Sequence, residues 1–236
     1  MKKLLLFITT FACVVFLNAQ SPAEQALYLQ LSSKGDDSVT ALKEILDKPG
    51  SASAVMLYTA SGVALREKRL EDSGFLFYVA RFRAQFDREL FPPTGTGGDS
   101  PMVLFGALQQ QLGSVVNPAL MAEPKVFAKV LARVRSWRPE VPNGYLPGWE
   151  FSQKESPKKA EASIQDGRTK FLDGMGGICT LLQDDAYFAA FKIAQDYNLK
   201  PRAEKPTKEA FDAAMKMMER IESEKGIQGV ATKTKK

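Results

Sequence analysis

Apolar residues recur at the three- and four-residue spacing of amphipathic helices along almost the whole chain, and this spacing restricts the fold more than any other feature. The alternating apolar and polar runs that are typical of half-buried strands are scarce. The sequence therefore predicts an all-α protein. The expected helices cover residues 22–33, 37–48, 52–67, 70–90, 101–115, 124–137, 157–182, 184–198 and 206–225.

Several helix starts carry local signals. Ser100-Pro101 is an N-cap followed by a proline at the first helical position, and Ser156 is placed to cap the helix that follows it. Pro124 and Pro206 are placed for the same first-position role.

Three segments interrupt or follow this helical pattern. Residues 91–99 form a loop by composition, and residues 138–156 form one long Pro/Gly loop that also contains aromatic residues. After residue 225 the chain has few large apolar side chains and ends in lysines. We therefore expect residues 226–236 to be a disordered basic tail.

The first half of the chain contains a possible repeat. Within 52–90, small residues at Ser61 and Ser73 would let two helix backbones approach each other, and Phe77 would fill the gap between them. A shift of 35 residues places three earlier residues over these positions, namely Ala26, Ser38 and Leu42. Over residues 22–90 this pattern resembles the tetratricopeptide family, whose repeat is 34 residues long.

That resemblance implies antiparallel helix pairs stacked as a short TPR-like solenoid, with an extended groove suited to peptides or protein surfaces. An irregular antiparallel helical bundle is the alternative, and both architectures are all-α. Residues 91–137 would then add further helices, and residues 157–225 would form the C-terminal helices of a single domain over 20–225.

The N-terminal segment has the layout of a secretory signal peptide. Lys2 and Lys3 precede an apolar run from Leu4 to Leu17, and Ala19 supplies a small residue at the expected cleavage point. The run is short for a bilayer span, which needs roughly 20 residues. We expect residues 1–19 to be removed near Ala19. The mature protein would then be periplasmic or secreted and would have no membrane span.

The absence of histidine excludes several kinds of site. Ser-His-Asp and Cys-His catalysis, HExxH zinc sites and haem ligation by histidine all need a residue that this chain lacks. Cys13 falls in the predicted signal peptide, so Cys179 remains alone and is expected to be a small buried hydrophobe. The residues present suggest no cofactor and no metal site.

The charge balance is mild. The formal net charge falls from +5 to +3 when Lys2 and Lys3 are removed with the signal peptide. This is too weak a balance to indicate nucleic-acid binding. We expect the partner to be another protein or a peptide.

Aromatic residues in and beside the 138–156 loop are the candidate partner-binding residues. They are Trp137, Tyr145, Trp149 and Phe151. Arg133, Arg135 and Arg138 surround Trp137 in sequence, and an arginine over an indole face is a common binding contact. The alternatives are that these arginines complete a helix C-terminus and that the loop aromatics pack on the helices.

Residues 75–79 are apolar on all sides of their helix, which predicts burial of that helix on most of its surface. Three arginines follow on the same helix: Arg81, Arg83 and Arg88. An arginine that becomes buried there needs a carboxylate partner. Glu67, Glu71 and Asp72 are the candidates.

The favoured function is an exported, non-enzymatic helical module that binds another protein, either as an envelope scaffold or as an inhibitor of the immunity type. The alternative is a carboxylate-dependent hydrolase acting on cell-envelope material, since paired carboxylates can hydrolyse sugars. A carrier that holds a small ligand in an aromatic cleft is a third possibility.

Overall fold

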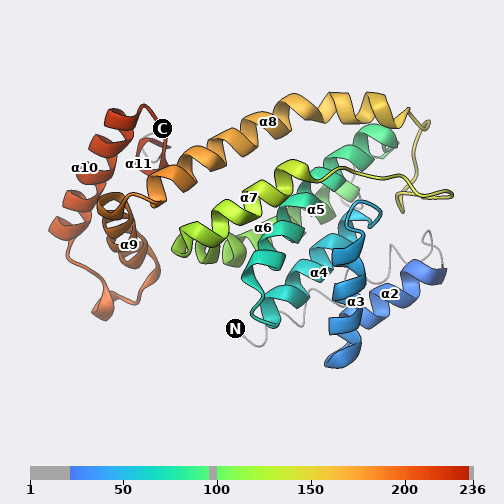
Figure 1. Cartoon of the computed structure of the whole chain (residues 1–236), viewed down its shortest axis with the longest axis horizontal. Coiled ribbons are helices and arrows are strands. Elements are labelled where there is room, and N and C mark those ends of the chain that lie inside the picture. The colour runs from blue at the N-terminus through green and yellow to red at the C-terminus, as the bar shows by residue number, and fades with distance from the viewer. Residues whose placement is uncertain (1–21, 96–99, 234–236) are drawn as a thin grey trace.

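A computed structural model describes residues 22–95 and 100–233 and confirms the all-α prediction (Figure 1). The predicted signal peptide lies outside these residues. The only β-type pairing in the described part of the chain is an isolated bridge between Pro93 and Phe151. The helices are α2 (Pro22–Ser32), α3 (Asp36–Asp47), α4 (Ala54–Arg66), α5 (Leu70–Leu90), α6 (Pro101–Ala122), α7 (Pro124–Ser136), α8 (Pro157–Leu182), α9 (Asp185–Leu199), α10 (Lys208–Lys225) and α11 (Val230–Lys233), with a 3₁₀ turn at Arg202–Glu204.

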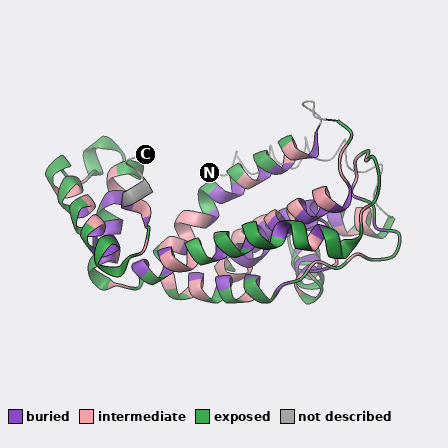
Figure 2. Cartoon of the chain, turned by 90° about the horizontal axis from the view of Figure 1, so that it is seen from above, coloured by how far each residue is buried: buried purple, intermediate pink, exposed green. Residues whose placement is uncertain are grey.

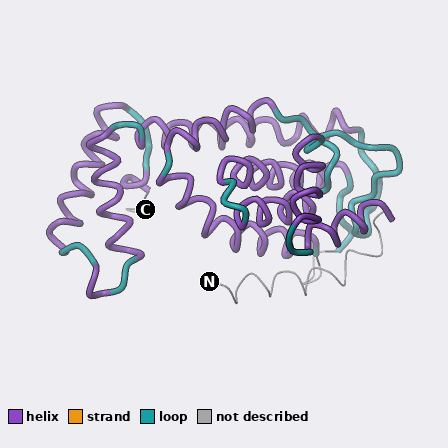
Figure 3. Tube along the Cα trace, turned by 60° about the horizontal axis from the view of Figure 1, so that its bottom comes forward, coloured by secondary structure: helices purple, strands orange, loops and turns teal. Residues whose placement is uncertain are grey.

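Helix α5 lies at the centre of the body and contacts α4, α6, α7 and α8. The long helix α8 crosses the body and leads to α9, α10 and α11, which lie together at one end of the molecule (Figure 1). Figure 2 shows the buried residues on the helix faces that point inward. Most connections are short, and the longest one between described helices is the stretch between α7 and α8 (Figure 3).

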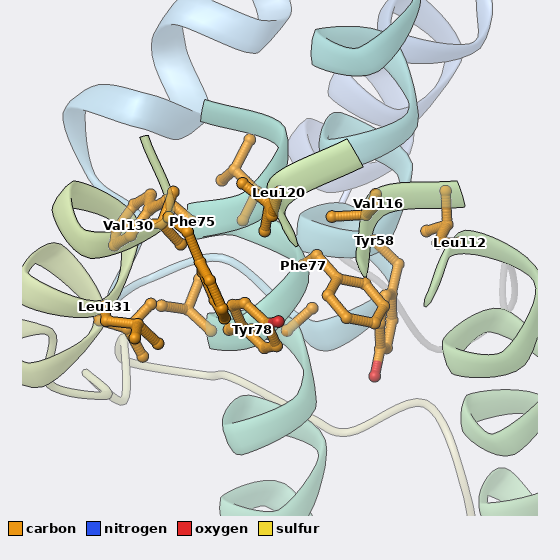
Figure 4. Packing of buried hydrophobic residues seen from close by; sticks show 14 of the residues in the cluster. Tyr58, Phe75, Phe77, Tyr78, Leu112, Val116, Leu120, Val130 and Leu131 are labelled. Carbon is orange, nitrogen blue, oxygen red and sulfur yellow. The ribbon is translucent and has the colours of Figure 1, made fainter. Parts of the chain in front are cut away.

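The apolar segment of α5 forms the middle of the core, as its composition predicts. Phe75, Phe77 and Tyr78 are all buried, and they point to different neighbouring helices (Figure 4). The Tyr78 hydroxyl donates a hydrogen bond to Oδ1 of Asn117 on α6 at 2.9 Å. Residues 75–79, which are apolar on all sides of α5, are thus buried on all sides.

Helices α4 and α5 approach each other through small residues. Ser61 and Ser73 are completely buried, and the Ser61 hydroxyl donates to the Ser73 carbonyl at 2.9 Å. A Cβ atom at Gly74 would lie 2.8 Å from Cδ1 of Leu120, so α6 also packs directly on the α5 backbone. These contacts leave room only for small residues at Ser61, Ser73 and Gly74.

The predicted N-caps at Ser100 and Ser156 are confirmed. The Ser100 hydroxyl accepts from the Met102 amide, and the Ser156 hydroxyl accepts from the Lys159 amide. Pro124 begins α7 as expected. Pro206 does not occupy the first position of α10 as expected, because Thr207 is the N-cap and the helix begins at Lys208.

Helix α6 extends beyond its predicted end. The sequence predicts a helix over 101–115, whereas α6 continues to Ala122 with Pro118 inside it. An internal proline costs about 3 kcal/mol in a helix. Val116 and Leu120 are completely buried on the last two turns, and their burial offsets that cost.

The prediction that the chain is disordered from residue 226 was wrong for residues 226–233. Gly226 adopts a left-handed conformation with φ 62° and ends α10, so the chain turns back on itself. Ile227 then packs against the core close to Gly177, where an added Cβ atom would lie 2.9 Å from Cγ2 of Ile227. Ala231 is completely buried.

A buried carboxylate holds this C-terminal segment. Oε1 of Glu222 accepts a hydrogen bond from the Tyr187 hydroxyl at 2.8 Å and another from the Ala231 amide at 2.9 Å. The scarcity of large apolar side chains after residue 225 does not reveal this attachment, because the hydrogen bond to Glu222 comes from the backbone amide of Ala231. Residues 234–236, the last part of the predicted tail, lie outside the described residues.

Among the described residues, no helix is both long enough and apolar enough to cross a membrane.

Candidate functional site

A buried arginine positions the aromatic loop, residues 138–156, on the helical body. Arg83 of α5 is completely buried, and its Nε lies 2.8 Å from Oδ1 of Asp87 one turn later. Its Nη1 donates to the carbonyl oxygens of Gly50 at 2.7 Å and Glu140 at 2.8 Å. One guanidinium therefore joins α5 to the α3–α4 connection and to the aromatic loop.

Tyr145 completes this buried group, which we call the Arg83 cluster: Arg83, Asp87, Tyr145 and the carbonyls of Gly50 and Glu140. The Tyr145 hydroxyl donates to Oδ2 of Asp87 at 2.7 Å, and the Arg83 guanidinium lies 4.4 Å from the centre of the Tyr145 ring. Burial raises the pKa of the Tyr145 phenol well above its ordinary range. Burial also raises the pKa of the Asp87 carboxyl, and Arg83 opposes that rise.

The sequence predicted the need for a carboxylate but named the wrong partner for Arg83. Asp87 lies four residues later on the same helix, whereas the candidates were Glu67, Glu71 and Asp72. Glu71 and Asp72 instead bind Arg133 of α7, at 3.1 and 3.0 Å. The i, i+4 spacing of Arg83 and Asp87 is the signal in the sequence that could have identified the pair.

Two of the four candidate partner-binding residues are buried. Trp137 and Tyr145 are 5% and 6% exposed, and the Trp137 indole donates to the Pro49 carbonyl at 3.2 Å. The cation beside the Trp137 ring is Arg168, at 5.5 Å, and not one of the three arginines that flank it in sequence. Arg168 Nη2 also donates to the carbonyls of Val134 and Trp137, and so completes the C-terminus of α7.

Trp149 and Phe151 are half-buried and also pack on the body. The Trp149 indole donates to the Phe91 carbonyl at 2.9 Å, and its ring meets Phe105 edge to face at 6.0 Å. Phe151 meets the Phe91 ring at 5.0 Å. The structure thus brings Tyr145, Trp149 and Phe151 to one side of the body, where their observed contacts hold the loop in place.

A groove with a volume of about 590 Å³ lies elsewhere on the molecule. It lies where the corner between α6 and α7 faces the corner between α8 and α9 (Figure 1). We call it the corner groove. Its apolar lining residues include Val126, Leu182 and Phe188, and its charged lining residues are Glu123, Lys125 and Asp185.

Both corners are tight, and a buried thiol joins them. Only Glu123 separates α6 from α7, and only Gln183 and Asp184 separate α8 from α9. The Cys179 thiol donates to the Pro124 carbonyl at 3.4 Å and accepts from Nε2 of Gln183 at 3.7 Å. Burial raises the pKa of this thiol, so it behaves as the small buried hydrophobe that the sequence predicts.

The charged side chains on the two walls differ in their pairing. Asp184, next to the groove, caps α9 through the Ala186 and Tyr187 amides and pairs with Lys225 at 3.0 Å. The carboxylates of Glu123 and Asp185 form no ion pair or hydrogen bond with any described residue. Each helix corner therefore contributes one carboxylate without an ion pair to the lining of the groove.

The sequence did not predict this groove. Pro124 and the pair Asp184-Asp185 mark both helix starts, but nothing in their local patterns shows that the two corners meet in space. The described residues contain no group of three or more potential metal ligands from histidine, cysteine, aspartate and glutamate. Comparison of the chain with protein-family models, curated proteins and solved structures gave no significant match.

Proposed function

We propose that the mature protein is an exported, non-enzymatic module that binds another protein or a peptide, and that the corner groove receives an apolar side chain of that partner. The observation that carries the proposal is an open groove of about 590 Å³ lined by Val126, Leu182 and Phe188. Ligand sites typically measure about 300–1,000 Å³ and combine an apolar lining with a few polar groups. The corner groove has both properties.

The aromatic loop is a less suitable contact surface. The Trp149 indole and the Tyr145 phenol of the loop, and the indole of Trp137 just before it, already donate hydrogen bonds to groups of the body, and Trp137 and Tyr145 are buried. A side chain that is needed to hold its own loop gains little from a partner. We therefore place the principal contact in the groove and leave Trp149 and Phe151 as its half-buried alternative.

Site-specific crosslinking in cells tests the proposal. A photo-crosslinking amino acid at Gln183 would lie in the groove, because Gln183 is exposed and lines it. The same amino acid at Gln165, on an exposed face of α8, is the matched control. We expect a discrete crosslinked product from position 183 and none from position 165. Equal products from both positions, or none from either, would contradict the proposal.

One observation favours the alternative hydrolase: Glu123 and Asp185 line the same groove. Both residues are exposed, however, whereas a general acid in such enzymes is usually desolvated so that it stays protonated. Release of soluble fragments from purified cell-wall glycan by the mature protein, and its loss in Glu123→Gln and Asp185→Asn, would establish the hydrolase instead.

A further inference from the structure

The charged residues that line the corner groove indicate the charge of its occupant. We infer that it selects a cationic segment, in which an apolar side chain is flanked by lysine or arginine. This inference rests on the proposed function and specifies the class of partner.

The apolar part of the groove fixes where the uncharged side chain goes. Val126 comes from the first turn of α7, Leu182 from the end of α8 and Phe188 from the first turn of α9. Leu182 belongs to the main hydrophobic core and Val126 and Phe188 pack against it, so the surface they form is backed by the body of the protein. An apolar side chain placed there loses its contact with water.

The two unpaired carboxylates lie on opposite walls, since Glu123 belongs to the α6–α7 corner and Asp185 to the α8–α9 corner. Their usual explanation is that acidic residues favour helix N-termini. That explanation accounts for their residue type but leaves both carboxylates without a counter-ion. The Glu123 side chain makes no capping hydrogen bond, and Asp184 rather than Asp185 caps α9.

Two lysines lie nearby, and only Lys125 belongs to the lining of the groove. Lys125 follows Glu123 by two residues at the start of α7, a spacing at which helical side chains do not face each other. Lys192 lies on α9 one turn after Phe188, and its ammonium is 5.7 Å from the centre of the Phe188 ring. Neither lysine forms an ion pair with a described residue. The lining itself therefore keeps an excess of one negative charge, with a carboxylate on each wall.

Defined peptides can test the inference. The probes are fluorescein-labelled dodecapeptides of glycine and serine with one of two central sequences, Lys-Leu-Phe-Lys or Glu-Leu-Phe-Glu. Exposed ion pairs are individually weak, so the lysine peptide should bind about threefold to tenfold more tightly by fluorescence anisotropy at low salt. This ratio should shrink toward one at high salt, because salt screens exposed charges.

Two pairs of variants locate the effect. Glu123→Gln with Asp185→Asn should abolish the preference, whereas Asp36→Asn with Asp37→Asn, at the exposed start of α3, should leave it unchanged. Gln183→Trp should block the groove and weaken binding of both peptides, whereas Gln165→Trp should not.

The outcomes separate this inference from the proposed function. Equal binding of both peptides, a preference for the glutamate peptide, or a lysine preference that persists in Glu123→Gln/Asp185→Asn would overturn the inference. A crosslink at position 183 would still support the proposed function in each case. If neither peptide binds and no crosslink forms at position 183, both fail together.

Discussion

Replacement of Arg83 by methionine isolates the contribution of the Arg83 cluster to stability. The guanidinium is completely buried and Asp87 is 1% exposed, so the substitution leaves a buried carboxylate without its countercharge. It also leaves the Gly50 and Glu140 carbonyls without their donor. Loss of one partner of a buried ion pair typically costs about 3–5 kcal/mol. We expect a loss in this range, a large fraction of the ~5–15 kcal/mol that stabilises a typical domain.

The assay is urea unfolding of the protein followed by circular dichroism. Arg133→Met is the matched control, because Arg133 also pairs with carboxylates but its side chain is 34% exposed. Surface ion pairs contribute about 0–1 kcal/mol, so the control should unfold close to the wild type. Tyr145→Phe removes only the hydroxyl that donates to Asp87, and we expect it to cost about 1.5–3 kcal/mol.

A further variant tests the reasoning behind these numbers. Arg83→Met combined with Asp87→Leu removes both charges, so it should recover part of the loss caused by Arg83→Met alone. The recovery should be incomplete, since the two backbone carbonyls remain unpaired. If Arg83→Met costs no more than Arg133→Met, the cluster does not hold the loop and our account of it is wrong.

Three further predictions concern other parts of the molecule. Removal of residues 226–236 exposes the core surface that Ala231 covers and removes one hydrogen-bond donor from Glu222. It should cost about 2–4 kcal/mol of stability and lower the melting temperature by about 5–10 °C in calorimetry. An unchanged melting temperature would show that the segment is not attached in solution. Trp149→Ala leaves the Phe91 carbonyl without its donor and a gap beside Phe105, and should cost about 2–4 kcal/mol in denaturant melts; a negligible change would return Trp149 to the list of contact residues. The Tyr187 amide and the Lys225 ammonium lower the pKa of the Asp184 carboxyl in the folded protein, so its stabilising effect is present above about pH 4 and is lost as the pH falls through the folded pKa. When the pH is lowered from neutral to about pH 3, the Asp184→Asn variant should therefore lose less stability than the wild type, measured as the shift in urea midpoint. An identical pH dependence of the two proteins would show that the Asp184 carboxylate does not stabilise the fold.

Much of the helical pattern could be predicted because local signals coincide with helix boundaries. Ser100, Ser156 and Pro124 mark helix starts through capping and proline geometry, which involve only neighbouring residues. The end of α6 was missed because a proline inside a helix is tolerated only when tertiary packing offsets its cost. Here that packing comes from Val116 and Leu120.

The features that sequence reasoning missed all depend on contacts between distant segments. The attachment of Ala231 requires Glu222 and Tyr187 to be brought together, and the corner groove requires two helix corners to face each other. No local pattern contains that information. The aromatic residues of the loop were recognised as requiring either packing or a partner, and only the fold shows how they pack.

The Arg83 cluster has a consequence for the order in which the chain folds. Arg83 hydrogen-bonds to Gly50, 33 residues earlier, and to Glu140, 57 residues later. Closing such long loops costs entropy before any contact repays it, whereas the Ser61–Ser73 contact spans only 12 residues. We therefore expect the α4–α5 pair to belong to the folding nucleus and the cluster to form after the transition state. Variants at Ser61 should then slow refolding, while variants at Tyr145 should mainly accelerate unfolding.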